Sequence, residues 1–411
     1  MSSLTASPLS KKISTTAGLL FLIFIISTFI LDDSKYKTLF YITLPIPALL
    51  LIKELLNYNK ETLHVFISLT AVLIYFSIST LWSNEPNLIE NLKYSLLILL
   101  FFILSLEYCK QVKYKTTVKI LFYFTSFLAL FYLASFIYTY GFNIPVQIRL
   151  NLSDILSPSE NNPISSGVIL GVIFLISLEM IKNSSKKELL IIILTIISTG
   201  LLLILTKSRG PLISLFIATT LTLIIKRDTK TLITVSALSF CCLLLLLTTD
   251  LYSTLMQRLE QPNYRLAIWK ETLLMMENSW LFGQGIGGKA GINIGTGSLA
   301  GFTHSHSFML EAFRTGGVFG LIIFAGFILN TTLQSIKNNN YGLFFAWLIF
   351  GMLCLSTNGR FPLMRPNIEW FCFWIPLFLW YGYSINNTNL AEHKTKHKQT
   401  TNNKQQTTNY K

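Results

Sequence analysis

Charged residues are scarce in this sequence. Only 13% of the 411 residues are charged, while 52% are hydrophobic; a soluble domain carries roughly 25% charged residues. A chain of several soluble domains is therefore excluded. Many of the Leu-, Ile- and Phe-rich runs approach the roughly 20 residues that cross a bilayer as a helix. We expect one all-α, polytopic membrane protein.

Acidic residues and cysteines are few as well. The chain has 19 acidic against 33 basic residues, a net charge of +14, but the basic residues stand in short loops between apolar runs, as membrane topology requires. We therefore expect no nucleic-acid partner. The five cysteines lie within or beside apolar runs, without CxxC or metal-ligand spacing. We expect them to be small buried hydrophobic residues.

The apolar runs predict about twelve transmembrane helices. Lys11 and Lys12 precede the first run, which ends without a small-residue cleavage site, so we expect a retained helix and not a signal peptide. Pro45 and Pro47 should kink the second helix. The predicted spans are 13–31, 37–56, 63–82, 92–109, 117–140, 163–181, 188–206, 210–225, 231–248, 308–330, 341–357 and 370–385.

The distribution of lysine predicts the orientation. If the N-terminus is cytoplasmic and the helices alternate, the inner loops hold most of the lysines, whereas the outer loop 83–91 holds no basic residue. Basic residues mark the cytoplasmic side of membrane proteins. Both termini should therefore be cytoplasmic.

Arginine follows the opposite pattern and gathers on the outer side. The planar guanidinium keeps its charge and binds phosphate through two parallel hydrogen bonds. We therefore expect the outer face to recognise an anion, with interfacial snorkelling as the alternative explanation for some of these arginines. Only Arg227 falls on the inner side, and the outer segments contain Arg149, Arg209, Arg258, Arg265, Arg314, Arg360 and Arg365.

The longest outer segment, 249–307, interrupts the bundle. Its part 264–280 has apolar residues at helical spacing, which predicts an amphipathic helix at the membrane surface. A glycine-rich stretch follows from Gly283 to Gly301. Residues 386–411 are rich in Asn, Gln, Thr and Lys, which predicts a disordered cytoplasmic tail. We therefore divide the chain into a membrane bundle, 1–385, and this tail.

Two short arginine motifs lie on the outer side. The connection Lys207-Ser208-Arg209-Gly210 is so short that Arg209 must lie at a helix end near membrane depth, where an unpaired cation is costly and commonly functional. Arg265 begins the amphipathic segment. Each motif alone also fits an interfacial arginine, so the prediction depends on their combination.

Two histidines complete the set of candidate residues. His304 and His306 stand together on the outer side, immediately before the apolar run 308–330. Histidine is the usual proton acceptor near neutral pH. No outer cluster of carboxylates or cysteines supplies the further ligands that zinc would need. We therefore expect no metal ion and no cofactor.

Fixed positive charges beside a base suit group transfer from a lipid-linked donor with a phosphate or diphosphate leaving group. Arginines would offset the charge that develops on the leaving group. A histidine would deprotonate the attacking hydroxyl. Composition and spacing do not name the substrate.

The residues around the histidines resemble a known family. His306-Ser307, a nine-residue spacer, Gly317, two residues and Gly320 are similar to the signature of the O-antigen ligase and O-antigen polymerase superfamily of bacterial cell-envelope proteins. The resemblance covers roughly 149–330 and the topology of the whole chain. Further similar elements are RLAIW at 265–269, ENSWLFGQGIGG at 277–288, SRG at 208–210 and NPI at 162–164.

The resemblance implies a metal-independent, inverting transfer of a glycan from undecaprenyl diphosphate, at the periplasmic face of the bacterial inner membrane. In O-antigen ligases the acceptor is a sugar hydroxyl on the lipid A–core. By this resemblance His306 activates the acceptor, and Arg209 and Arg265 hold the diphosphate. Some members have an important aspartate near the eleventh outer loop; this chain has none there, so that role is not transferred. Arg360, in the same loop, is expected to add positive charge to the diphosphate site.

The remaining polar residues are interpreted by their positions. His306 should begin the long helix, where the helix N-terminus favours a neutral imidazole, and it is preferred to His304 as the base. Glu311 and Arg314 stand three residues apart on this helix and should form an ion pair. His304, Lys207 and Arg314 are expected to support the site.

Three other functions stay open. An O-antigen polymerase and a protein O-oligosaccharyltransferase would use the same donor, and the histidine signature favours the ligase over both. A transporter or flippase is the alternative of a different class. Transporters place ionisable residues near the middle of the bilayer and often show repeats, whereas the predicted spans here are largely uncharged and the polar residues gather at one face.

Overall fold

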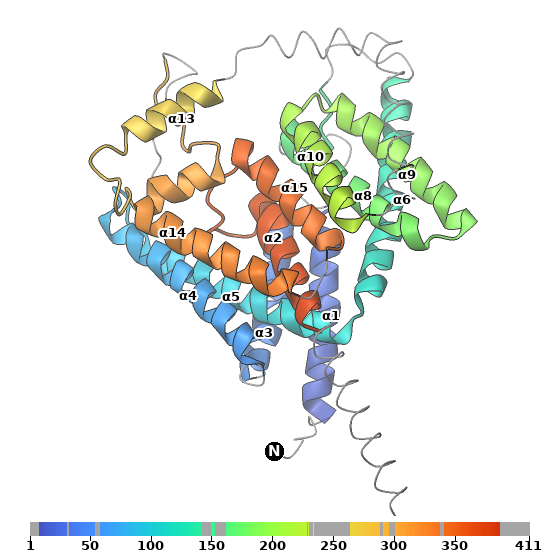
Figure 1. Ribbon diagram of the computed structural model, residues 1–411, viewed down its shortest axis with the longest axis horizontal. Coiled ribbons are helices and arrows are strands. Elements are labelled where there is room, and N and C mark those ends of the chain that lie inside the picture. The colour runs from blue at the N-terminus through green and yellow to red at the C-terminus, as the bar shows by residue number, and fades with distance from the viewer. Residues whose placement is uncertain are drawn as a thin grey trace, which may run out of the picture.

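The computed structural model describes residues 8–30, 33–53, 58–141, 149–152, 162–227, 229, 233, 264–287, 291–295, 301–337 and 341–386. This part of the chain is built of helices (Figure 1). Its only β-type pairing among the described residues is an isolated bridge between Ile292 and Phe302. The prediction of an all-α protein is confirmed for these residues.

The helices follow the predicted apolar runs. The long ones begin or end at polar residues: Asn59 accepts a hydrogen bond from Thr62 N–H at the start of α4, and Ser185 and Glu188 form a capping box on α9. Such caps satisfy backbone N–H groups that have no partner within the helix. The elements are α1 Pro8–Ser27, α2 Asp33–Thr43, α3 Pro45–Leu51, α4 Lys60–Ser79, η2 Thr80–Trp82, α5 Leu88–Gln111, α6 Tyr114–Tyr140, α8 Pro163–Met180, η3 Ile181–Asn183, α9 Lys186–Leu205, α10 Arg209–Lys226, α13 Arg265–Leu274, α14 Phe308–Ile336, α15 Leu343–Asn358 and η5 Trp370–Trp374.

Seven of the described helices are long and apolar enough to cross a membrane, namely α4 with η2, α5, α6, α8, α9, α10 and α14. The apolar helices Lys12–Ser27 and Leu343–Asn358 are shorter. The chain is therefore a multi-span membrane protein. The predicted span 231–248 lies almost entirely outside the described residues, as do 249–263 and the predicted tail after 386. The total of about twelve spans stays a prediction.

The second predicted span is divided in two. α2 ends at Thr43 and α3 begins at Pro45, with Leu44 between them. Proline cannot donate a backbone hydrogen bond, and its ring clashes with the preceding turn, so a new helix begins where an old one cannot continue. The kink expected at Pro45 and Pro47 is confirmed.

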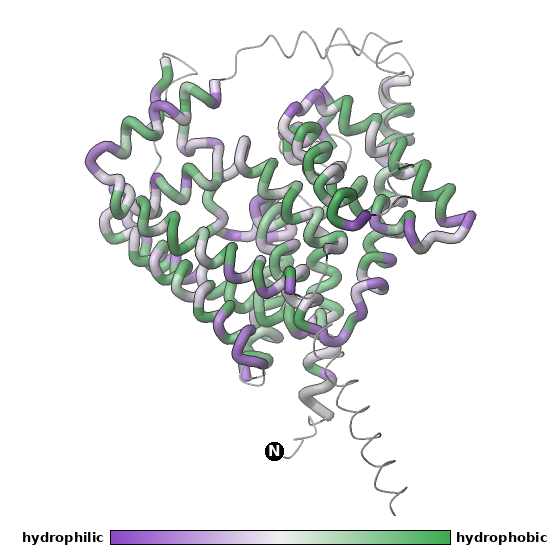
Figure 2. The backbone as a smooth tube through the Cα atoms, in the orientation of Figure 1, coloured by the Kyte–Doolittle hydropathy of each residue, from purple (hydrophilic) through white to green (hydrophobic). Residues whose placement is uncertain are grey.

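The bundle packs around aromatic side chains. α14 packs along α4, α8 against α9, and α10 along α15. Trp347, Trp370, Trp374 and Trp380 are fully buried. Hydrophobic residues predominate along most of the helices (Figure 2), and many large hydrophobic side chains of these helices are exposed. An outward apolar surface of this kind suits contact with lipid, because a soluble protein would turn polar side chains outward.

The two ends of the bundle differ in chemistry. At one end, Tyr114 at the start of α6 donates a hydrogen bond to Glu179 at the end of α8, over 2.8 Å, and Lys226 at the end of α10 forms an ion pair with the same carboxylate. The opposite end of α10 begins with Arg209, one of the candidate site residues. In Figure 1, α13 lies at the top of the view, far from the start of α1.

Candidate active site

The loop before α14 holds both histidines in a defined geometry. Ser305 N–H donates to Glu311 Oε2 over 3.1 Å, and Ser305 Oγ donates to the carbonyl of Ser307 over 3.1 Å. His306 has a φ of 54°, in the left-handed region that residues with a Cβ rarely adopt. Such strained conformations cluster at functional sites. α14 begins at Phe308, with Ser307 as an extended N-cap, so the prediction that His306 begins the helix was wrong by two residues.

The two imidazole rings lie against each other. Their centroids are 4.0 Å apart, and the ring of Phe302 stands edge-on to His306. Thr303 Oγ1 and His304 Nδ1 are 3.1 Å apart and hydrogen-bonded. Both rings are partly buried. Because two adjacent imidazolium ions would repel each other in a partly dry site, the pair favours neutral rings.

The surroundings strengthen this preference for neutral histidine. Burial lowers the pKa of His304 to about 3, with the charges of His306 and Arg360 acting in the same direction. Burial, the charge of Arg265 and that of Arg360 lower the pKa of His306 below its usual value, against a hydrogen bond with Asn358 that raises it. At neutral pH His306 is therefore an unprotonated imidazole, the form that accepts a proton.

Arg209 is presented by a tight turn between α9 and α10. α9 ends at Leu205, Lys207 has a left-handed φ of 51°, and α10 begins at Arg209. The turn is held by Arg149, whose Nε donates to the carbonyl of Thr206 over 3.2 Å. The predicted place of Arg209 at a helix end is confirmed. Lys207 shapes the same turn.

Arg265 lies within electrostatic reach of Arg209, although it stands 56 positions later in the sequence. It is the first residue of α13 and is partly buried. Burial and the charge of Arg209 lower the pKa of Arg265. Since the charge of Arg265 also acts on His306, Arg265 links the three residues predicted to bind the donor and to act as base, which are called the diphosphate cluster below.

Arg360 approaches the histidines from a third element. It follows the end of α15 at Asn358, and its backbone N–H donates to Glu369 Oε1 over 3.3 Å. Its charge acts on both imidazoles. Sequence reasoning missed Asn358; the polar run STNGR at the end of an apolar helix was the available signal.

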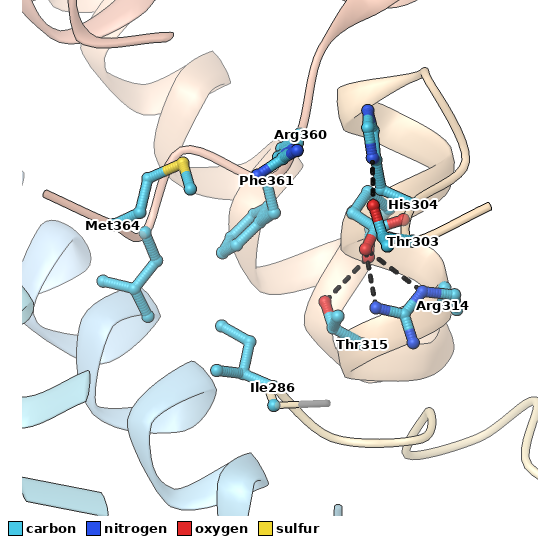
Figure 3. A pocket seen from close by; sticks show the side chains of 11 residues that line it. Ile286, Thr303, His304, Arg314, Thr315, Arg360, Phe361 and Met364 are labelled. Atoms are coloured by element: carbon cyan, nitrogen blue, oxygen red, sulfur yellow. Dashed lines mark hydrogen bonds and ion pairs between the residues drawn. The ribbon is translucent and has the colours of Figure 1, made fainter. Parts of the chain in front are cut away.

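A cavity of about 370 Å³ opens beside His304 and Arg360 (Figure 3). In Figure 3, Phe361 and Met364 lie on one side of it, and Thr303, His304 and Arg314 on the other. The lining consists of Ile286, Gly287, Thr303, His304, Glu311, Arg314, Thr315, Arg360, Phe361, Leu363 and Met364.

The predicted ion pair between Glu311 and Arg314 is confirmed and lies beneath the histidine loop. Arg314 Nη2 is 2.6 Å from Glu311 Oε1, and the two residues are 4% and 5% exposed. Arg314 Nη1 also donates to Gln284 Oε1 over 3.3 Å. A buried pair of this kind holds geometry, because each charge depends on its partner. Arg314 therefore supports the loop through Glu311.

A break in α14 seats the segment 280–285 against the site. Gly317 has a φ of 63° inside the helix. The backbone groups freed there are satisfied from outside: Val318 N–H donates to the carbonyl of Trp280 over 2.9 Å, and Gln284 N–H donates to that of Arg314 over 2.8 Å. A Cβ on Gly317 would lie 2.2 Å from Leu281 O. Gly317, the first glycine of the signature, is therefore required because the backbone at Leu281 leaves no space for a side chain.

Among the described residues, no three His, Cys, Asp or Glu side chains are grouped so that they could hold a metal ion. The polar groups near His306 are instead cationic or neutral, apart from Glu311, which is paired. The site is therefore suited to an anionic ligand. Metal independence stays a prediction.

Comparison with known proteins agrees with this geometry. Residues 192–325, which contain Arg209, Arg265 and both histidines, match a family model described as O-antigen ligase. Over 365 residues the chain is 29% identical to an O-antigen ligase of Pseudomonas aeruginosa, and this similarity covers 86% of each protein. The match extends well beyond the signature to the bundle that carries it. The chain is thus similar to O-antigen ligases over most of its length, and the family model matches the part that carries the site.

Proposed function

We propose that this protein is an O-antigen ligase that transfers a glycan from undecaprenyl diphosphate to a sugar hydroxyl of the lipid A–core. The observation that supports it best is the cluster of Arg209, Arg265 and His306, in which two fixed positive charges lie beside a neutral imidazole. The reaction takes place at the periplasmic face of the inner membrane.

The proposed reaction is a single displacement. The acceptor hydroxyl oxygen attacks the anomeric carbon of the glycan, the bond from that carbon to the diphosphate oxygen breaks, and the hydroxyl proton passes to the imidazole of His306. Undecaprenyl diphosphate leaves with the electron pair of the broken bond. Arg209 and Arg265 stabilise its growing negative charge, as fixed cations do at other leaving groups. The anomeric configuration is inverted.

The placement of the site favours an enzyme over a transporter. The polar residues gather at one end of the bundle and are carried by loops and helix termini. A transporter would instead place its binding residues near the midplane, between broken helices.

Deletion of the gene tests the proposal. A deletion strain is expected to accumulate full-length glycan on the lipid carrier and to make lipopolysaccharide with a bare core. Core that carries a single repeat unit would indicate a polymerase instead. Loss of glycan from proteins, with normal lipopolysaccharide, would indicate a protein oligosaccharyltransferase. The purified protein should also transfer glycan in the presence of EDTA, which tests the metal independence separately.

A further inference from the structure

The charged residues around His306 fall into two groups. The charge of Arg209 acts on Arg265, and neither residue lines the described part of the cavity. Arg360 and His304 both line the cavity. His306 links the groups: its ring touches that of His304, and the charges of Arg265 and Arg360 both reach it.

This division matters for an inverting displacement. The nucleophile and the leaving group must lie on opposite sides of the anomeric carbon, roughly in line, and the base must reach the nucleophile. If the diphosphate lies at Arg209 and Arg265, the acceptor hydroxyl has to approach His306 from the other group of residues. The cavity is lined by this other group, Arg360 and His304, and the ring of His304 contacts that of His306.

Resting on the proposed ligase function, we propose that this cavity binds the acceptor, as a sugar residue with an acidic substituent, and that Arg360 contacts this substituent. Arg360 is thereby an acceptor-specificity residue and not part of the diphosphate site to which its sequence position assigned it. The acidic group is a phosphate or a carboxylate.

The shape and lining of the cavity fit such a ligand. Its volume of about 370 Å³ is at the small end of the roughly 300–1,000 Å³ of small-molecule sites, which suits one sugar unit and not a polymer. Phe361, Leu363 and Met364 form an apolar surface for the C–H face of a sugar ring. Thr303 and His304 offer hydrogen-bonding groups on the opposite side.

The charge balance of the cavity favours an anion. Among its described lining residues, Arg314 is neutralised by Glu311 at 2.6 Å, and His304 is uncharged at neutral pH because burial lowers its pKa to about 3. The described lining of the cavity therefore carries a net positive charge from Arg360, while the buried carboxylate of Glu369 accepts a hydrogen bond from the backbone N–H of this residue. Arg360 is an exposed residue that lines the cavity, so an incoming group can reach its side chain without rearrangement of the core.

Steady-state transfer by the purified full-length protein tests the assignment. The probes are an undecaprenyl diphosphate–linked glycan and lipid A–core from a strain of the same bacterium that makes no O-antigen. Arg360→Gln is expected to raise the KM for lipid A–core roughly 10- to 100-fold, the effect of losing a hydrogen bond to a charged group, and to leave the KM for the donor within about twofold. Arg360→Lys should recover part of the loss.

Two treated acceptors identify the anion. Lipid A–core freed of phosphate by hydrofluoric acid, or with carboxylates converted to amides, is compared with the untreated form. When the anion that contacts Arg360 is removed, the wild type should show a higher KM for the treated acceptor. The wild type and Arg360→Gln should then have similar KM values for this acceptor. If both neutralised acceptors still distinguish the two proteins, the proposed anion contact is wrong.

Arg365→Gln is the matched control, because Arg365 is an exposed arginine of the same loop that does not line the cavity. It should leave both KM values unchanged. A rise in donor KM with unchanged acceptor KM in Arg360→Gln would overturn the inference and return Arg360 to the diphosphate site. Failure of the wild type to transfer any glycan would instead contradict the proposed function, so the two failures are distinguishable.

Discussion

The carboxylate of Glu311 accepts a hydrogen bond from the backbone N–H of Ser305, the residue between the two histidines. The same carboxylate is paired with Arg314 through its other oxygen. One buried side chain on α14 thus holds the loop that places His306 in its left-handed conformation. The proposed base is positioned from within the helix that follows it.

Replacement of the two histidines should have unequal effects. His306→Ala removes the proposed proton acceptor and is expected to lower kcat roughly 10²- to 10⁴-fold. His304→Ala leaves that acceptor in place and should lower kcat far less. The measurement is glycan transfer by purified protein, with equal thermal stability of the variants as the control. Equal losses in both would argue that the two imidazoles act as a unit.

The pH dependence of kcat/KM should report the pKa of His306 in the free enzyme. The base is active when unprotonated, so activity is present above this pKa and is lost as pH falls through it. Because burial and the charges of Arg265 and Arg360 lower the pKa, the loss of kcat/KM at acid pH should occur below the usual histidine value of about 6.5.

Two variants should shift the acid limb of the profile, the pH range in which activity is lost on acidification, in opposite directions. Arg360→Gln removes a positive charge that lowers the pKa of His306, so the limb moves to higher pH. Asn358→Leu removes a hydrogen bond that raises this pKa, so the limb moves to lower pH. Profiles of kcat/KM are recorded with the acceptor varied at concentrations below its KM, and Arg365→Gln is the control. A limb that stays fixed in both variants would show that His306 is not the titrating group.

The ion pair beneath the loop should contribute strongly to stability. Glu311→Gln leaves Arg314 buried without a counter-charge, and breaking a buried pair in this way costs about 3–5 kcal/mol. The double variant Glu311→Gln/Arg314→Gln should be more stable than the single one, because no buried charge is left. Thermal unfolding in detergent measures both. Additive losses in the double variant would contradict the pairing.

Gly317→Ala should disturb α14 and the site together. An L-residue at a φ of 63° is disfavoured by about 1–2 kcal/mol, and its Cβ would also overlap the Leu281 carbonyl. We expect lower thermal stability and lower transfer. Gly326 lies in the same helix with open space around its Cβ position, so Gly326→Ala should be tolerated. Comparable losses in the two variants would indicate a general intolerance of this helix.

The role of Arg209 in diphosphate binding is tested by two substitutions, one that removes its positive charge and one that keeps the charge but changes the shape of the cationic group. Arg209→Gln should raise the KM for the donor, and Arg209→Lys should restore it only in part, because lysine lacks the planar fork that binds phosphate through two bonds. Arg227, exposed at the far end of the same helix, supplies the control Arg227→Gln. An unchanged donor KM in Arg209→Gln would remove this residue from the cluster.

Local patterns predicted much of this molecule. Apolar runs of membrane length placed the helices, and prolines placed the break between α2 and α3. The spacing of Glu311 and Arg314 predicted their pair, since residues three apart share a helix face. Arg209, Arg265 and His306 were chosen for their chemistry, and the structure brings them together although they come from three separate elements.

The rest depends on contacts between distant segments. The left-handed backbone of His306 stands next to a hydrogen bond between Ser305 N–H and the Glu311 carboxylate. The cavity is completed by Arg360, which approaches from the end of α15. Neither relationship leaves a periodic signal in the sequence. The glycine of the signature indicated a special backbone position, but the segment that occupies the space beside it lies more than 30 residues earlier.

The interrupted backbone of α14 has a consequence for assembly. Around Gly317 the backbone N–H and carbonyl groups of this helix are not all paired within the helix. Their hydrogen-bond partners are backbone groups of Trp280 and Gln284, which precede the helix in the sequence. Hydrocarbon offers no such partners. The preceding segment must therefore pack against α14 for these backbone groups to be paired, so that closure of this helix and assembly of the histidine site depend on the same contact.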